Sequence, residues 1–398
     1  MKVIWVANVK VNPGSNILGG WLESQYTHLK ERGIQVLLMH PSSLKERKEF
    51  GAFSRVKDND YSIQRAMGYF AEVIKDFSPD FIHIHGTELP HALAVARAAR
   101  KCGVPYIVSL QGIVGEIYRH VGTGLEPNII FKKTFRDIFF GGGVNGLRKL
   151  YKKRSFYEVE VVEGALCILG RTEWDRAWVD LNFKNKNYHV SLEPLRKQFL
   201  FADNWNYEKC KKRRIFIAQG ANPIKGLHVF LEALKLLKKR YEDIEVVISG
   251  DDFSGNDFFS KIKRTSYQRY ILQTIKNEFA DCVSFVGYLS ASQMIENFLQ
   301  SNVYVQSSLI ENSPNSLMEA VYLGVPAVAS YVGGVPSIYS NEKVLFYQAD
   351  SPLMLAKKID DVFKMTEFID SVELDINTES VGNGLIEVYD EVIRLQGF

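Results

Sequence analysis

The chain has 398 residues, of which 46% are hydrophobic and 24% charged, and its formal net charge at pH 7 is +3. This length favours two hydrophobic cores over one, and the composition is that of an ordinary globular protein. The small net charge gives no indication of a nucleic-acid partner, and no stretch approaches the roughly 20 apolar residues that span a bilayer.

Cysteine spacing and the first residues indicate a protein of the cytoplasm. The four cysteines are scattered without the spacing of a metal site, which suits a reducing compartment and predicts no structural zinc. Residues 1–7 combine one lysine with a short apolar run, so we expect a first β-strand rather than a signal peptide.

Short apolar runs alternate with helical patterns along the whole chain. In the first half, the predicted strands are 3–7, 34–39, 80–84, 105–110 and 165–169. In the second half, they are 214–219, 244–249, 282–286, 302–306 and 326–330. Two successive sets of βα units predict an α/β protein with two doubly wound parallel sheets facing each other.

Domain boundaries follow from polarity and periodicity. The polar stretch 195–213 lacks a clear period and is the predicted crossing between the domains. We therefore expect a first domain at 1–194, a second at 195–378, and a final amphipathic helix at 379–398 that returns to the first.

Two glutamates, Glu311 and Glu319, stand eight positions apart in the most informative segment of the chain. A buried strand precedes them, and Ser313 is the predicted N-cap of a helix with Pro314 at its first position. Gly324 is expected to end that helix, on which Leu317 and Val321 supply the buried stripe. One carboxylate then lies in the loop and the other about two turns inside the helix.

The chemistry of this segment suits a ligand that is part sugar and part diphosphate. The free N–H groups and the positive end of the helix dipole favour a phosphate, whereas carboxylates accept hydrogen bonds from sugar hydroxyls. The plainer alternative makes Glu311 a surface loop residue and Glu319 a solvated helix residue. We prefer the ligand site because ligands of open α/β sheets gather at the carboxyl ends of strands.

Residues 128–160 depart from the alternation of strand and helix patterns. This segment combines aromatic and basic side chains with a flexible triple glycine. Its apolar members include Phe135, Phe139 and Phe140, and its basic members include Lys132, Lys133, Lys149, Lys152 and Lys153. The pattern resembles an amphipathic element that binds anionic lipid. The alternative is a helix hairpin that packs on its own domain with a solvated basic face.

Two weaker signals concern metals. His83 and His85 point to the same side of a predicted strand, but no third ligand is placed, so His85 is better interpreted as lining a cleft for an acceptor. Asp251 and Asp252 follow another strand and are interpreted as a loop turn. Neither a dinucleotide-binding glycine fingerprint nor a phosphate-binding loop is present.

The segment with Glu311, Glu319 and Gly324-Val325-Pro326 resembles the retaining GT-B glycosyltransferases of family 4, also called glycosyl transferases group 1. The same resemblance is carried by Gly19-Gly20, Pro223-Ile224-Lys225-Gly226 and Gly333-Gly334. The resemblance covers nearly the whole chain. It implies two Rossmann-like domains, the first binding the acceptor and the second a nucleotide sugar, with no metal or other cofactor.

The resemblance also assigns roles. Glu319 is expected to accept both ribose hydroxyls, Glu311 to contact the donor sugar, and Lys225 to bind the diphosphate. The donor set further comprises backbone or side chains of Gly19, Gly20, Arg171, Gly220, Gly287, Tyr288, Asn312, Ser313, Asn315 and Ser316. Glu311, Lys225 and Gln111 are the predicted catalytic residues, and His85 and Gln111 are predicted to lie on the acceptor side.

Three positions depart from the family pattern. Gly220 stands where an arginine is common, Gln111 where a histidine is common, and Ser337 where a glutamate is usual. Arg171 is the candidate to supply the missing charge at the diphosphate.

The predicted function is transfer of a sugar from a nucleotide diphosphate sugar to a hydroxyl of a glycan or lipid-linked acceptor, in cell-surface polysaccharide synthesis. UDP-sugars are preferred and GDP-sugars are the second choice. The predicted location is the cytoplasm, with peripheral binding to the inner face of the cytoplasmic membrane. A non-hydrolysing nucleotide-sugar epimerase and a catalytically silent nucleotide-binding module are the alternatives.

Overall fold

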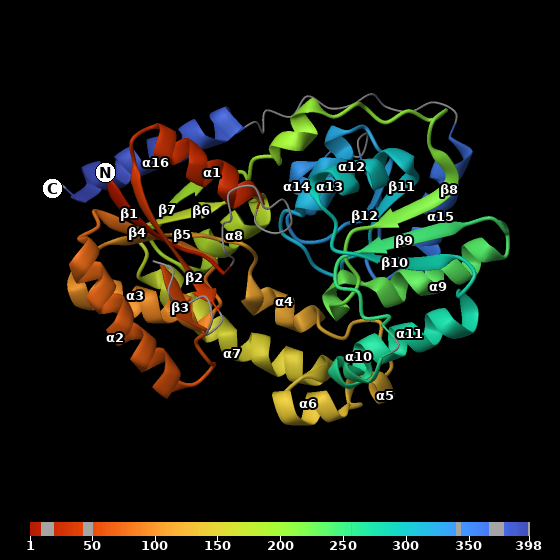
Figure 1. The fold of residues 1–398 in the computed structure, drawn as a ribbon, viewed down its shortest axis with the longest axis horizontal. Coiled ribbons are helices and arrows are strands. Elements are labelled where there is room, and N and C mark those ends of the chain that lie inside the picture. The colour runs from red at the N-terminus through yellow and green to blue at the C-terminus, as the bar shows by residue number, and fades with distance from the viewer. Residues whose placement is uncertain (9–19, 43–50, 256, 340–343, 366–377, 397–398) are drawn as a thin grey trace. The chain divides into compact units, whose positions relative to one another are not determined.

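The computed structural model describes residues 1–8, 20–42, 51–255, 257–339, 344–365 and 378–396 (Figure 1). The chain divides into two compact units. The first comprises Met1–Gly115, Tyr151–Lys197 and Asp375–Phe398, and the second comprises Glu116–Leu150 and Gln198–Leu374.

The first unit is built on a parallel seven-stranded sheet in the order β3-β2-β1-β4-β5-β6-β7. Its strands are β1 (Lys2–Val6), β2 (Gln35–Ser42), β3 (Ala52–Ser54), β4 (Phe81–His85), β5 (Tyr106–Ser109), β6 (Cys167–Gly170) and β7 (Asn187–Val190). Strand β1, in the interior of the sheet, places Val3 opposite Val36 of β2 and Phe81 of β4. All five residues of β4 are buried, as expected for a strand that is covered on both faces.

Helices cover both faces of this sheet. They are α1 (Gly20–Glu31), α2 (Asp60–Phe77), α3 (Pro90–Cys102), α8 (Glu173–Asn182), α16 (Thr378–Gln396) and the second half of α7 (Gly143–Glu163). One buried cluster joins the sheet to α2, α3, α7 and α8, and another joins it to α1 and α16. The indole N–H of Trp5 donates to the hydroxyl of Tyr389 over 2.7 Å, which ties α16 to β1.

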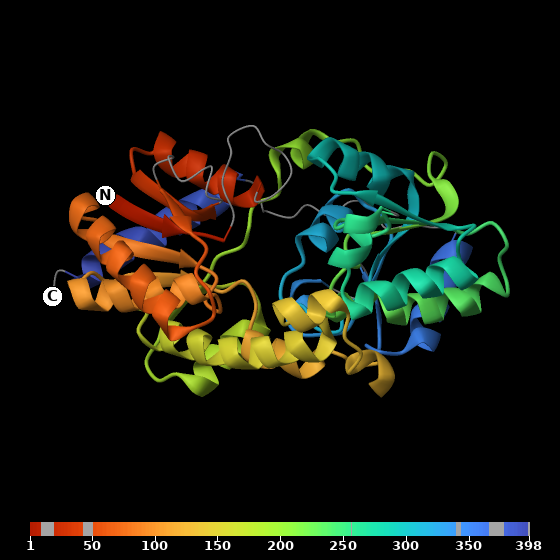
Figure 2. The same ribbon diagram turned by 60° about the horizontal axis from the view of Figure 1, so that its bottom comes forward.

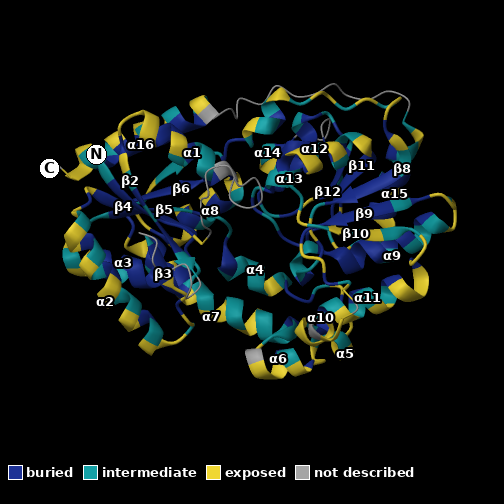
Figure 3. Ribbon diagram, in the orientation of Figure 1, coloured by how far each residue is buried: buried dark blue, intermediate teal, exposed yellow. Residues whose placement is uncertain are grey.

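The second unit is built on a parallel six-stranded sheet in the order β10-β9-β8-β11-β12-β13. Its strands are β8 (Lys211–Ile217), β9 (Glu245–Ser249), β10 (Val283–Gly287), β11 (Ser301–Gln306), β12 (Ala327–Ser330) and β13 (Val344–Tyr347). Within each unit the strands are largely buried, and the exposed residues gather on the helices and loops (Figure 3).

The helices of the second unit connect these strands or precede them in the chain. They are α5 (Pro127–Ile130), α6 (Phe135–Phe140), η1 (Lys197–Phe201), η2 (Pro223–Lys225), α9 (Leu227–Lys238), α10 (Phe258–Lys263), α11 (Ser266–Glu278), α12 (Ala291–Gln300), α13 (Asn315–Tyr322), α14 (Val335–Ile338) and α15 (Pro352–Lys364). Helices α9 and α11 lie side by side (Figure 2). Helix α4 (Val114–His120) spans the first passage of the chain from one unit to the other.

The predicted α/β class with two doubly wound parallel sheets is confirmed. Three strands were not predicted, namely β3, β7 and β13, and each has only three or four residues. None of the described helices is long and apolar enough to cross a membrane.

The division of the chain differs from the sequence-based boundaries at residues 116–150, which group with the second unit. His228 Nε2 on α9 lies 2.8 Å from the carbonyl of Thr123. The carboxylate of Asp137 accepts from the backbone N–H of Ser266 over 2.9 Å. These contacts join residues far apart in the chain, so local sequence patterns gave no indication of them.

Candidate functional site

The carboxyl ends of the neighbouring strands β8 and β11 carry two loops that are bonded to each other. The N–H of Leu309 donates to the carbonyl of Ile224 over 2.7 Å, and the hydroxyl of Ser307 donates to the carbonyl of Lys225 over 2.9 Å. Gly226 ends η2 with φ +68°, and a Cβ atom there would lie 1.9 Å from the Ser307 carbonyl oxygen. Glycine is therefore required for this close approach, which fixes the position of Lys225.

Lys225 and Glu311 form an ion pair across the two loops, with Nζ 2.6 Å from Oε2. Their side chains are 24% and 17% exposed, so the pair is sheltered but accessible. The amide of Gln306 and the hydroxyl of Ser308 lie 3.4 and 3.3 Å from the same Glu311 oxygen. The carboxylate is thus held from three directions, and the ammonium keeps further N–H donors for a ligand.

A polar network beneath this pair links β11 to the start of α13. The Gln306 amide donates to the Ser308 hydroxyl over 2.8 Å. The Tyr304 hydroxyl lies 3.0 Å from Gln306 Oε1 and 2.8 Å from the Ser316 hydroxyl. Burial raises the pKa of Tyr304 above its usual value, and the nearby charges of Glu319 and Glu311 raise it further. Tyr304 therefore stays a protonated hydrogen-bonding group.

Sequence reasoning missed Gln306 and Ser308 as partners of Glu311, and Tyr304 as the link from Gln306 to Ser316. The available signal was alternation: Tyr304 and Gln306 are two positions apart on one strand, so their side chains share a face of the sheet. Polar residues repeated on one face of a buried strand require partners, and Glu311 and Ser316 provide them.

Helix α13 begins at Asn315, with Pro314 as its N-cap and without a side-chain cap bond. The prediction that Ser313 caps the helix and Pro314 occupies its first position is therefore wrong by one residue. Pro314 has φ −78° and ψ 111°, an extended conformation that keeps it outside the helix. The helix ends as expected, with Gly324 at φ +76°.

Glu319 is a buried residue of α13, only 5% exposed, and Leu317 and Val321 are buried on the same helix. This corrects the plainer alternative in which Glu319 is a solvated helix residue. Asn312, in the loop after Glu311, is also buried at 2% exposure. This edge of the sheet therefore carries two carboxylates that can accept hydrogen bonds: that of Glu319 is buried, and that of Glu311 is partly exposed.

The Gly333-Gly334 turn closes on the backbone of Glu311. A Cβ at Gly333 would lie 2.0 Å from the Glu311 carbonyl oxygen, and the N–H of Gly334 donates to that oxygen over 3.1 Å. The hydroxyl of Ser337 donates to the carbonyl of Gly334 over 2.8 Å, so Ser337 supports the turn. Two glycine contacts, at 226 and 333, therefore hold the loops that carry Lys225 and Glu311.

Three other predicted residues of the second unit lie on nearby strands or loops. Gly220 is buried, and a Cβ there would lie 2.5 Å from Leu227 Cδ2, so the fully buried Leu227 occupies this space. Gly287 ends β10 with φ +70°, and Tyr288 after it is 58% exposed.

The loop with Asp251 and Asp252 is the turn that the sequence predicted. Asp252 accepts from the N–H and hydroxyl of Ser254 over 2.8 and 2.6 Å.

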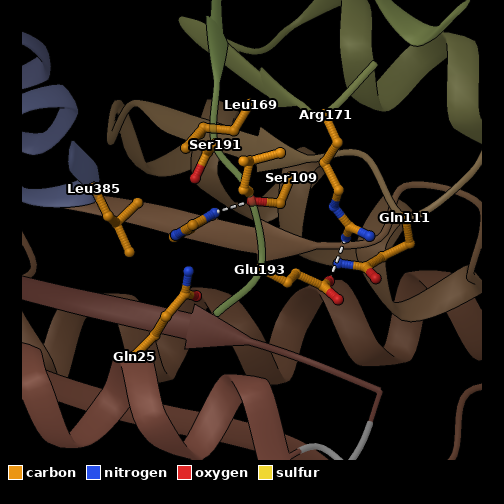
Figure 4. Close-up of a pocket in the computed structure, with 10 residues that line it drawn as sticks. Gln25, Ser109, Gln111, Leu169, Arg171, Ser191, Glu193 and Leu385 are labelled. Atoms are coloured by element: carbon orange, nitrogen blue, oxygen red, sulfur yellow. Dashed lines mark hydrogen bonds and ion pairs between the residues drawn. The ribbon is translucent and has the colours of Figure 1, made fainter. Parts of the chain in front are cut away.

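Two of the predicted residues of the first unit, Gln111 and Arg171, line a cavity of about 10 Å³, the volume of roughly one water molecule (Figure 4). Arg171 forms an ion pair with Glu193, and their side chains are 6% and 5% exposed. Gln111 lines the same cavity. Withdrawal of Arg171 would leave the Glu193 charge buried without this partner, which is strongly unfavourable. The geometry favours a fixed Arg171, and its role toward a diphosphate stays a prediction.

The two histidines of β4 are buried and neutral. His83 Nδ1 lies 2.6 Å from the Tyr389 hydroxyl, and Nε2 lies 2.7 Å from the Ser109 hydroxyl. Burial lowers the pKa of His85 to about 3, assisted by the charge of Arg171. Both nitrogens of His83 are engaged in holding α16 and β5.

The predicted glycine loop of the first unit is described only in part. Gly20 is the first residue of α1, and Gly19 lies outside the described residues.

Two family models match the chain. "Glycosyl transferase 4-like domain" matches residues 25–189, and "Glycosyl transferases group 1" matches residues 202–373. Together they cover most of both units.

Curated relatives are distant. Spore coat protein SA of Bacillus subtilis (strain 168) is 23% identical over 192 residues, 46% of this chain and 49% of that protein. The putative teichuronic acid biosynthesis glycosyltransferase TuaC of the same strain is 21% identical over 396 residues, 90% of this chain and 88% of that protein. The chain thus spans about half of the first relative's length and most of the second's.

Solved structures share the fold. HepE of Anabaena, in complex with UDP and glucose, has a TM-score of 0.66 at 14% identity, covering 98% of this chain and 100% of that one. The UDP-GlcNAc 2-epimerase of Methanocaldococcus jannaschii, in complex with UDP-GlcNAc and UDP, has a TM-score of 0.57 at 11% identity, covering 98% and 100%. With the two family models, these likenesses place the chain in the GT-B fold, with a glycosyl transferase 4-like domain followed by a group 1 glycosyltransferase domain.

Proposed function

We propose that the chain is a retaining glycosyltransferase of the hexosyltransferase type and that its second unit binds a nucleotide diphosphate sugar. The observation that carries this proposal is the Lys225–Glu311 ion pair, 2.6 Å long, which the close contacts of Gly226 and Gly333 hold at the carboxyl edge of the sheet. This edge also presents the start of α13, whose dipole favours a phosphate. The group 1 match over 202–373 covers all of these residues.

We propose the following donor roles for residues of the second unit. The Lys225 ammonium has three N–H donors and directs one at Glu311, which leaves two for the diphosphate. The amides of Asn312 to Ser316 would bind phosphate and sugar oxygens, and Glu319 would accept the ribose hydroxyls. The exposed ring of Tyr288 after β10 is the candidate contact for the base.

The proposed reaction breaks the bond between the anomeric carbon and the diphosphate oxygen. The acceptor oxygen forms its new bond on the same face of the sugar, and its proton passes to the leaving phosphate oxygen. Lys225 and the amides at the α13 terminus would stabilise the charge that develops on the diphosphate, an electrostatic contribution that is commonly the largest in such steps. Gln111 and His85 are the proposed acceptor-side residues of the first unit.

UDP-sugars are the proposed donors and GDP-sugars the second choice. The HepE structure with UDP and glucose supports the first choice at the level of the fold. The name of TuaC, with teichuronic acid biosynthesis, supports a glycan or lipid-linked acceptor in a cell-surface polysaccharide pathway. We propose a cytoplasmic location on that basis, with no metal required.

Two alternatives have specific support. A non-hydrolysing epimerase shares the fold, and it would convert a nucleotide sugar without any acceptor. A catalytically silent nucleotide-binding module is suggested by Gly220 and Ser337, which replace an expected arginine and glutamate.

The test is incubation of the full chain with a panel of nucleotide sugars, with and without lipid-linked and soluble glycan acceptors. We expect acceptor-dependent release of the nucleoside diphosphate, unaffected by chelators, and a product with the donor's anomeric configuration. Conversion of the donor alone would support the epimerase. Binding without turnover over all acceptors would support the silent module.

A further inference from the structure

Exposed aromatic and aliphatic side chains gather on α6, on the residue after α5, and on α10, all in the second unit. Phe135, Ile138 and Phe139 of α6 are exposed by 63% to 72%, and Phe131 just before it by 66%. On α10, Phe258 is 71% exposed and Ile262 is 43% exposed. These six residues define the aromatic surface. Clustered exposure of large apolar side chains indicates a binding surface rather than ordinary solvent contact.

The two helices that carry the aromatic surface are fixed to each other by buried polar bonds. Asp137 Oδ2 accepts from the N–H of Thr134 and from the N–H of Ser266, each over 2.9 Å. The carboxylate of Asp137 therefore accepts backbone hydrogen bonds at the N-termini of both α6 and α11. The Thr134 hydroxyl also donates to the carbonyl of Arg264, just after α10, over 3.1 Å. The apolar residues of α6 are thus presented outward from an anchored helix.

Basic side chains are interspersed with the aromatic surface. Lys132, Lys133 and Arg136 flank the phenylalanines of α6, and Lys261 and Lys263 lie on α10. Arg136 lies 4.0 Å from the carboxylate of Asp137, whereas the four lysines form no ion pair with any residue that the structure describes. Of the nearby carboxylates, Asp137 is buried in its capping bonds and Asp257 caps α10. The surface therefore combines exposed rings with uncompensated positive charge.

We propose that the aromatic surface docks on an anionic lipid bilayer, with the rings in the interface and the lysines at the headgroups. Charge complementarity selects this occupant: the lysines lack carboxylate partners, and their long stems allow the ammonium groups to reach headgroups while the rings enter the apolar layer. The inference goes beyond the proposed function, because vesicle binding needs neither nucleotide nor acceptor.

The structure revises the membrane segment expected from the sequence. Lys153 donates to the carbonyl of Asp58 over 2.6 Å, and Arg154 pairs with the Asp58 carboxylate, so these two cations have partners in the first unit. The side chain of Phe140 lies outside the described part of the structure. Helix α10, which lies outside the predicted segment 128–160, contributes Phe258 and Ile262. The docking surface is therefore formed by two segments distant in sequence.

The experiment is sedimentation of the full chain with vesicles of phosphatidylcholine alone or mixed with phosphatidylglycerol, without nucleotide, at low and high ionic strength. Wild-type protein should bind the mixed vesicles at low salt and dissociate as added salt shortens the Debye length below about 10 Å. The F135S/F139S variant, which removes a stacked pair of exposed rings 5.7 Å apart, should bind at least about tenfold more weakly. K132E/K133E should also bind more weakly.

The matched control is L181S/F201S, which removes two apolar side chains that are 85% and 79% exposed and lie outside the aromatic surface. It should bind vesicles as the wild type does, and circular dichroism should show that all variants are folded. Equal sedimentation with both vesicle types, or no sedimentation at low salt, would overturn the proposal. Binding of F135S/F139S that matches the wild type would also overturn it. So would a wild type that forms a dimer but binds no vesicles, if F135S/F139S converts that dimer to a monomer.

Discussion

The ammonium of Lys225 lies 2.6 Å from Oε2 of Glu311, although 86 positions separate the two residues in the chain. The contact arises because β8 and β11 are neighbouring parallel strands, so the loops after them meet at the same edge of the sheet. A cation beside a carboxylate that is still partly exposed can bind a ligand bearing both phosphate and hydroxyl groups.

Replacement of Lys225 by alanine should reduce turnover by ~100-fold or more, through loss of charge stabilisation at the leaving diphosphate. The matched control is Lys235→Ala, because Lys235 is also a partly exposed lysine paired with a glutamate in the second unit. Steady-state kinetics with the best donor and thermal unfolding distinguish the roles. Normal turnover with a lowered melting temperature would make Lys225 a structural residue.

Replacement of Glu319 by alanine should weaken binding of the nucleoside diphosphate by ~2–3 kcal/mol, because two ribose hydroxyls lose a charged acceptor. Calorimetric titration measures this loss directly. Glu208→Ala, at an exposed glutamate of the same unit, is the control. Because Glu319 is buried, the isosteric Glu319→Gln is needed to separate lost binding from lost folding. Unchanged affinity in the glutamine variant and in a folded alanine variant would refute the ribose assignment.

Gly226→Ala should destabilise the protein by at least about 2 kcal/mol and lower donor affinity, because the new Cβ meets the Ser307 carbonyl at 1.9 Å. Gly103→Ala is a control with nearly the same backbone, at φ +69°, but with no atom within 4 Å of its Cβ. Denaturant titration compares the two. If both variants lose equal stability, the positive φ explains the effect and the contact with Ser307 does not.

Stability should decline as pH falls from about 6.5 toward 4, in part because of His228. Burial lowers its folded-state pKa to about 4, so the unfolded chain binds the proton first and is favoured as pH falls through this window. The slope approaches ~1.4 kcal/mol per pH unit for one such group. Thr123 and Tyr267 contact the ring, and Glu232 adds a weaker opposing charge.

The measurement is denaturant stability between pH 4 and 7 for the wild type and His228→Gln. The variant should show a shallower loss toward low pH, whereas His189→Gln, at a half-buried histidine, should follow the wild type. An unchanged slope in His228→Gln would assign the acid sensitivity to the other buried histidines whose pKa is lowered, His83, His85 and His91.

The sequence predicted what depends on local pattern. Apolar runs placed most strands of both sheets, and the spacing of Leu317 and Val321 placed the buried face of α13. The edge strands β3, β7 and β13 were missed; β7, for example, is partly exposed and polar at alternate positions, so it lacks the apolar run that marks the equally short but buried strands β6 and β12. The cap of α13 was misplaced because Pro314 suits both the position before the helix and its first turn.

Polar contacts between residues far apart in the chain could not be predicted from the sequence. Asp137 serves the starts of two helices, and Ser266, its second partner, is 129 positions away. The buried Arg171–Glu193 pair likewise joins two loops that follow different strands. No local period encodes such contacts, so the assignment of residues 116–150 to the second unit required the structure.

Titration calorimetry of the full chain with UDP-sugars and GDP-sugars, beside the double variant E311Q/E319Q, tests the central claim most directly. The account predicts saturable binding of at least one nucleotide sugar by the wild type, and its loss in a double variant that remains folded. Binding of no nucleotide sugar by the wild type, or equal binding by the double variant, would contradict a donor site built on Glu311 and Glu319.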